Sequence, residues 1–189
     1  MSKLLVFFVI TILLVSCDGR YRAHQSNQDV LKEHKLYESF SENVTYIPET
    51  YSEVMSDTLM NNGYHVKIKT YTDMDNSFLN VLKKDMITHK NYYRNLKTAV
   101  NISKDNQNIA STLITKDFVM NYDASYKAVL KNKIMQGVWL NQYASINTNS
   151  VVMDVLFIDP KENATACYRL TVNDNGDYSI ESKPQSKAV

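Results

Sequence analysis

Apolar and polar residues alternate along most of the chain after about residue 51. In residues 64–71, for example, Tyr64, Val66 and Ile68 are separated by histidine and lysine residues. A period of two is typical of a strand with one buried face. The Asn-Asn-Gly sequence at residues 61–63 tolerates positive φ and so predicts a hairpin turn before this strand. The strands predicted by this pattern cover residues 54–60, 64–71, 92–103, 109–115, 138–146, 151–158, 166–172 and 178–181.

Residues 151–158 carry the clearest strand pattern. They are apolar on both faces except at Asp154, which predicts a central strand covered on both sides. The strand should end at Asp159-Pro160, because proline cannot donate a hydrogen bond to a sheet. The residues at Asn173–Asp177 predict a tight turn, so the last three strands should form an antiparallel meander.

One helix is predicted between these strands. Asp123 is a favourable N-cap, and Gly137 lies where such a helix would end, so we expect a helix over residues 123–136. A short amphipathic helix at residues 29–40 is the alternative to irregular structure there. The predicted fold is therefore α+β and mainly antiparallel β, with seven or eight strands and one or two helices. A sandwich and a partly closed barrel both fit this pattern, and an all-β fold is the alternative.

The N-terminus has the order of a secretory signal. Lys3 precedes an apolar run at residues 4–15, and Ser16 and Cys17 follow it. This run is shorter than the roughly 20 apolar residues that a membrane-spanning helix needs. A plain N-terminal anchor, or a signal peptide that is cut elsewhere, is the alternative to cleavage before the cysteine.

The sequence Leu14-Val15-Ser16-Cys17 resembles the lipidation site of bacterial lipoproteins. In that family a small residue precedes a cysteine that receives diacylglycerol and becomes the mature N-terminus, so the resemblance implies that Cys17 is lipidated. The implied organisation is a signal peptide at 1–16, a lipidated N-terminus and tether at 17–48, a single β-rich domain at 49–183 and a tail at 184–189.

Together with residues 137–140 and 173–177, this signal makes the chain resemble the small lipoproteins of unknown function in Bacteroidetes. The resemblance implies a lipid-anchored protein of the bacterial cell envelope, and it transfers no functional residue. In that group, acidic residues soon after the cysteine accompany export to the cell surface. Here Asp18 is followed by Gly19-Arg20-Tyr21-Arg22, which favours a protein that faces the periplasm.

The composition of the chain limits the classes of partner and of stabilising cross-link that we expect. The chain has 21 basic and 20 acidic side chains and a formal charge of +1, so no global field attracts it to nucleic acid. Its 44% hydrophobic content is typical of a folded domain. Once Cys17 carries lipid, Cys167 has no partner for a disulfide within the chain. We expect the domain to fold without a metal or other cofactor.

No catalytic or metal-binding motif emerges from the sequence. No two of the 4 histidines are spaced i, i+4, as two ligands on one helix face would be. Cys167 is expected in the middle of a strand rather than at a helix start, where its pKa would be lowered. The stretch Asp73–Asn76 is similar to the start of a calcium loop but lacks the required glycine and distal glutamate, so we expect a hairpin turn there.

Two sets of residues are candidates for a role. Asp154 should need a partner if it is buried, and Arg169 on the next strand is the leading candidate for a structural ion pair, with catalysis as the alternative. Replacing Asp154 should then destabilise the domain far more than replacing Asp73. The second set consists of aromatic residues that either line a binding surface or fill the core: Tyr92, Tyr93, Tyr122, Tyr126, Trp139 and Tyr143.

The sequence thus favours a non-enzymatic envelope lipoprotein that binds a protein partner or a small ligand. A small hydrolase with a dispersed active site and an envelope-assembly or structural factor are the alternatives. Convergent acid, histidine and hydroxyl groups in one cleft would favour the enzyme, whereas an apolar cavity or an exposed aromatic face would favour binding.

Overall fold

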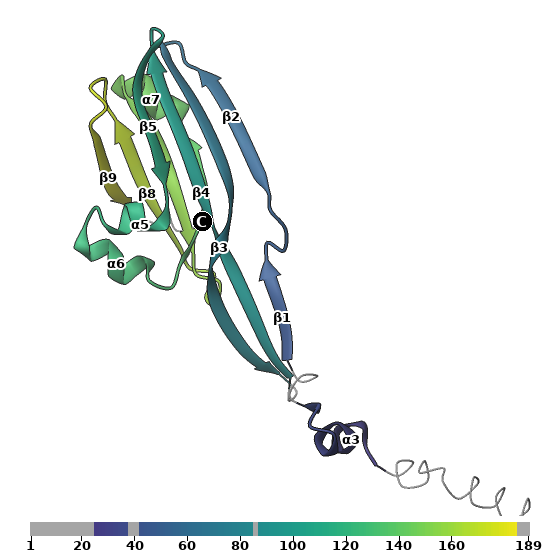
Figure 1. Cartoon of the computed structure of the whole chain (residues 1–189). Coiled ribbons are helices and arrows are strands. Elements are labelled where there is room, and N and C mark those ends of the chain that lie inside the picture. The colour runs from purple at the N-terminus through teal and green to yellow at the C-terminus, as the bar shows by residue number, and fades with distance from the viewer. Residues whose placement is uncertain (1–24, 38–41, 85–86, 185–189) are drawn as a thin grey trace, which may run out of the picture. The chain divides into compact units, whose positions relative to one another are not determined.

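The computed structural model describes residues 25–37, 42–84 and 87–184, which form nine strands and four short helices (Figure 1). The predicted signal and Cys17 lie outside these residues. The helices are α3 (Asn27–Glu33), α5 (Lys116–Met120), α6 (Ala124–Leu130) and α7 (Gln142–Thr148). The strands are β1 (Glu42–Ile47), β2 (Glu53–Leu59), β3 (Tyr64–Lys84), β4 (Ile87–Lys104), β5 (Gln107–Ile114), β6 (Ile134–Leu140), β7 (Val151–Ile158), β8 (Thr165–Val172) and β9 (Tyr178–Lys183).

The strands form two sheets. The first has the order β1-β4-β3-β2, with β5 also paired to β4, and the second has the order β6-β7-β8-β9. Neither sheet closes into a barrel. The prediction of an α+β fold with mainly antiparallel strands is confirmed, and the described residues contain nine strands rather than the predicted seven or eight, because β1 was missed.

A single hydrophobic core lies between the inner faces of the two sheets. Alternate residues of β3, such as Tyr64 and Val66, and alternate residues of β7, such as Val155 and Phe157, are each fully buried in it. Each such side chain contributes about 1.5–3 kcal/mol through burial. The two layers therefore make a sandwich, which is the arrangement that period-two patterning dictates when each sheet has one apolar face.

The central position of β7 is confirmed, because β6 and β8 pair with it on either side. Its second face is less covered than predicted, since Asp154, Leu156 and Ile158 are each half-buried. The meander of β7, β8 and β9 is confirmed as well, and the second hairpin turn lies at residues 173–177 as expected.

The helix predicted at residues 123–136 is wrong in its second half. Asp123 does cap α6 by accepting a hydrogen bond from the Ser125 N–H, but the helix ends at Leu130. Ile134 instead begins β6 and is paired with Ile158 of β7. Pairing with an apolar central strand outweighs the local helical pattern, as tertiary context commonly does.

Gly137 does not end a helix; it lies in β6 at a bulge, with φ of +144°. A side chain there would approach the Trp139 ring to 3.2 Å, so the position requires glycine on two grounds. The strand predicted at 138–146 is also too long. Asn141 caps α7 by accepting from the Ala144 N–H, and a helix follows where a strand was expected.

The largest departure from the sequence prediction is the length of β3 and β4. Asp73–Asn76 is not a turn but an uninterrupted part of β3, which continues to Lys84. Most residues of this extension are exposed, so the alternation that would have revealed a strand is weak. Of the helix considered for residues 29–40, the structure shows a shorter one at Asn27–Glu33, with Ser26 as its N-cap and His34 as its C-cap, and residues 38–40 lie outside the described residues.

Contacts divide the chain into two units. Val44–Leu82 together with Lys90–Val189 contains the core described above, and α3 belongs to the other unit. The sites considered below all lie in the unit that contains the core.

Candidate functional site

A cleft of about 480 Å³ opens beside α5, where that helix faces the middle of β3 and β4. This volume is within the usual range for small-ligand sites. Its walls combine polar side chains with those of Leu96, Leu113 and Met120, and the residues that matter most for its chemistry are Asp73, Asn76, Asn95, Lys97, Thr115 and Lys116.

Asp73 is the buried carboxylate of this cleft, with 6% of its side chain exposed. Oδ1 accepts from the Asp75 N–H at 3.1 Å, and Oδ2 accepts from the Asn76 amide at 3.1 Å. Lys97 Nζ lies 3.0 Å from Oδ1. The carboxylate is therefore fully engaged by groups of β3 and β4, and its place is set by the protein itself.

These contacts shift the pKa values of both partners. Burial works to raise the pKa of Asp73, but the hydrogen bonds from Lys97, Asn76 and the Asp75 N–H outweigh it and hold the pKa below its ordinary value of 3.8. The hydrogen bond to Asp73 raises the pKa of Lys97 above its ordinary value. Both groups are charged at neutral pH, so the positive charge of Lys97 is already compensated.

Lys116 is the second cation of the cleft and has a different environment. It is the first residue of α5, which Thr115 caps by accepting from the Phe118 N–H at 3.1 Å. Its Nζ donates to the backbone carbonyl of Lys131 at 2.9 Å. Within the part of the chain that the structure describes, no carboxylate lies within ion-pair distance of this ammonium group.

Burial lowers the pKa of Lys116, and the nearby charge of Asp117 opposes that shift. A half-buried ammonium group with one hydrogen bond to a neutral carbonyl retains two N–H donors. A desolvated charge of this kind is costly unless a counter-charge reaches it. The feature that sets this cleft apart is therefore a half-buried positive charge in its wall that makes no ion pair with any of the described carboxylates.

Asn95 connects the cleft to the second sheet. Its Oδ1 accepts from the Met135 N–H at 2.9 Å, at the bulge of β6. That bond fixes the orientation of the amide, so its NH₂ group is turned away from Met135. Asn95 and Lys116 line the cleft from β4 and α5, and both side chains carry N–H donors of the kind that a ligand with acceptor groups needs.

The structure places Arg169 directly opposite Asp154 in the register of β7 and β8. Arg169 Nε lies 3.4 Å from Asp154 Oδ1, and Lys183 Nζ lies closer, 3.0 Å from Oδ2. The sequence did not reveal Lys183, because its approach depends on the pairing of β9 with β8. Asp154 is 23% exposed, so the expectation that it is the more deeply buried acid is wrong and Asp73 is the buried one.

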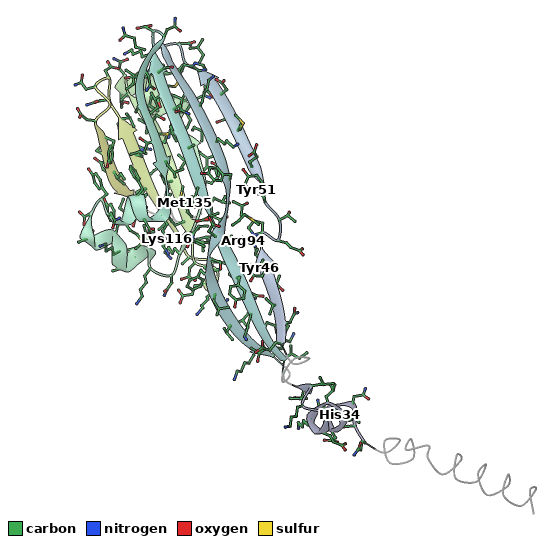
Figure 2. All side chains as sticks on the ribbon, in the orientation of Figure 1. His34, Tyr46, Tyr51, Arg94, Lys116 and Met135 are labelled. Carbon is green, nitrogen blue, oxygen red and sulfur yellow. The ribbon has the colours of Figure 1, made fainter. Side chains whose placement is uncertain are left out.

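The six aromatic candidates do not form one surface. Tyr126 stacks with Tyr122 at 6.4 Å and packs edge-on against buried Tyr168 at 4.7 Å, so it serves the core. Trp139 of β6 and Tyr143 of α7 are exposed, by 51% and 81%. Tyr92 and Tyr93 are half-buried residues of β4, and Tyr92 stacks with Tyr46. The guanidinium group of Arg94 lies over the same Tyr46 ring in a cation–π contact (Figure 2).

Cys167 lies within β8, as expected, and is half-buried. Burial raises the pKa of its thiol, and the negative charge of Asp154 adds to that shift. The thiolate is therefore scarce at neutral pH, which is the opposite of what a cysteine nucleophile needs.

The described residues contain no group of three or more side chains that could hold a metal ion. Within the same residues, no helix is both long enough and apolar enough to span a bilayer. No family model matches the chain, and comparison with curated proteins gives no significant match.

Asp73 and Lys116 were not identified from the sequence. The acidic stretch around Asp73 is typical of a turn, and only α5, some forty residues later, covers it. For Lys116 the one usable signal was Thr115, a favourable N-cap, which would have located the start of a helix but not the burial of the next side chain.

Proposed function

We propose that this protein is a lipid-anchored protein of the bacterial envelope that binds a small anionic ligand, and that it is not an enzyme. The observation that carries the proposal is Lys116, a residue of the cleft wall whose half-buried ammonium group has no carboxylate within ion-pair distance among the described residues. The order of Lys3, the apolar run and Cys17 supports the anchor.

An anion in the cleft would compensate the charge of Lys116. Lys97 is not available to bind the anion, because its ammonium group is already paired with the Asp73 carboxylate. A charge-assisted hydrogen bond to Lys116, with the amide of Asn95 nearby, favours a carboxylate or a similar compact monoanion. Exposed Asp117 lines the same cleft, and its negative charge disfavours ligands with several negative charges.

Binding without catalysis agrees with the side chains in the described part of the chain. A hydrolase needs an activated nucleophile, and the pKa of Cys167 is raised rather than lowered. The ring of His65 is engaged with Asp57 on an exposed strand rather than in the cleft. The cleft combines acid, amide and ammonium groups but no histidine.

The test is a thermal-shift measurement on the processed full-length protein in detergent, with acetate, pyruvate, glutamate and inorganic phosphate as probes. A ligand at about a hundredfold excess over its Kd adds about 2.7 kcal/mol of stability, which raises Tm by several degrees. We expect a small carboxylate to give such a shift, Lys116→Met to abolish it and Lys116→Arg to retain part of it.

Lys131→Met is the matched control, because this variant removes a neighbouring lysine side chain and keeps the carbonyl that Lys116 uses. An equal shift in Lys116→Met and in the unmodified protein, or no shift with any of the anions, would contradict the proposal. The anchor has its own test. Replacement of Cys17 by Ala should remove metabolic labelling with a fatty acid, whatever the ligand result.

A further inference from the structure

β2 is an edge strand that nothing covers in the part of the chain that the structure describes. It is the last strand in the order β1-β4-β3-β2, and Figure 1 shows it along the open side of the first sheet. Its apolar side chains are among the most exposed in the molecule: Val54 is 72%, Met55 67% and Leu59 75% accessible.

The backbone register shows which groups of β2 are unused. Met60 N–H donates to the Tyr64 carbonyl and Thr72 N–H to the Ser52 carbonyl, so these two pairs are hydrogen-bonded pairs at the two ends of the ladder. Hydrogen-bonded and non-bonded pairs alternate in an antiparallel ladder. The even-numbered residues of β2 therefore bond to β3, and the odd-numbered ones point their N–H and C=O groups outward. These outward residues are Glu53, Met55, Asp57 and Leu59.

The usual protections of an edge strand are absent from β2. Residues 53–59 contain no proline, and their register with β3 runs without a bulge. The two acids are each paired with cationic side chains of β3, which reduces but does not abolish their repulsion of another acid. Lys69 Nζ lies 2.8 Å from Glu53, and Asp57 is engaged by His65 and by Lys67. An exposed, apolar, regular edge with unused hydrogen-bonding groups is a template for another strand.

We propose that the strand that adds to this edge is β2 of a second copy of the chain, paired antiparallel about a two-fold axis at Ser56. In this register Met55 lies opposite Asp57 of the partner subunit and Glu53 lies opposite Leu59 of the partner subunit, so no acid directly faces an acid. A shift by two residues in one direction places Glu53 opposite an aspartate, and a shift in the other direction places two Asp57 residues together. Like charges directly opposite are destabilising, so charge selects the register centred on Ser56.

The other face of the strand fits the same arrangement. Val54 lies opposite Thr58 of the partner subunit, and β-branched pairs of this kind favour a sheet. The seam continues the apolar inner face that Val66 and Ile68 begin in β3. Self-complementarity of both faces, together with the outward backbone groups, is why we assign a second copy rather than an unrelated strand. This inference does not depend on the ligand proposed above.

The register predicts a specific cross-link. Even-numbered residues form non-hydrogen-bonded pairs across the seam, where Cα atoms are about 4.5 Å apart, within the range that a disulfide spans. In a Cys167→Ser background, Ser56→Cys should form a covalent dimer under mild oxidation. Val54→Cys is the matched control, because it is on the same strand and face but lies opposite Thr58 of the partner subunit, not opposite itself.

Sedimentation of the processed full-length protein in detergent gives the second measurement, and a dimer is expected. Met55→Pro removes an outward N–H and no bond to β3, so it should give a monomer with an unchanged circular dichroism spectrum. A monomeric unmodified protein overturns the proposal. A dimer that persists in Met55→Pro, or that cross-links equally through Val54→Cys, shows pairing elsewhere and overturns it too.

Discussion

The two sheets follow the same alternating pattern but meet different surroundings. On the inner face of β7, Val151, Met153 and Phe157 are at most 1% exposed, whereas Val54 and Leu59 of β2 are more than 70% exposed. Both strands carry apolar side chains in extended backbone, but β7 is apolar except at Asp154 and lies over the core, whereas β2 mixes apolar with polar residues and is exposed. Buried side chains are therefore concentrated between the two sheets, whereas the exposed apolar side chains of β2 lie at the edge of the first sheet, where the proposed partner strand would add.

The largest test of this contrast is a pair of truncations. Phe157→Ala removes a fully buried ring from the overlap and should cost about 3–5 kcal/mol of unfolding free energy. Leu82→Ala removes an apolar side chain that is 52% exposed in β3 and should change stability by no more than about 0.5 kcal/mol. Urea unfolding of the two variants measures both values. Similar urea midpoints for the two variants would contradict the expected difference between buried and exposed apolar side chains.

The second test compares the two engaged acids. Asp73→Asn removes the charged acceptor of Lys97 and of the Asp75 N–H, and it should lower the free energy of unfolding by about 1.5–3 kcal/mol. Asp154→Asn changes a partly exposed group and should cost about 1 kcal/mol or less. Chemical denaturation at neutral pH checks the order, which is the reverse of the one that the sequence predicted.

The pH dependence of stability gives a further test of the contribution of Asp73. The folded-state pKa of Asp73 is held below the ordinary value of 3.8, so its contribution is fully present above the unfolded pKa and is lost as pH falls through the folded pKa. The unmodified protein should therefore lose more stability than Asp73→Asn between about pH 6 and about pH 3. Equal losses would mean that the carboxylate makes no net contribution to the fold.

The smallest effect is expected at the outer face of β2. Lys69 pairs with Glu53 where both side chains are 41% exposed, so Lys69→Met should shift the melting temperature less than either acid variant. The residual shift should disappear in about 0.5 M salt, because salt screens exposed charges. A salt-independent loss of stability comparable to that of Asp73→Asn would show that the outer face of β2 is covered in solution. The proposed dimer covers only the backbone edge of this strand and does not predict such a loss.

The sequence was a sound guide where burial follows from neighbours along the chain. The meander of β7, β8 and β9 is joined by short turns, so the pattern of Val151–Ile158 and the turn at 173–177 sufficed to predict it. It failed at Ile134 and Gly137, where a helical pattern yields to pairing with β7. It also failed at Asp73 and Lys116, because the cleft forms only when α5 packs against strands distant in sequence.

The place of β1 has a consequence for the order of folding. Every other strand of the first sheet pairs with a strand next to it in the chain, whereas β1 pairs with β4 and skips β2 and β3. Local hairpins form first, since a longer loop costs more entropy to close. β1 is thus the strand expected to join last and to detach first. When it detaches, its six residues lengthen the N-terminal segment by about 20 Å.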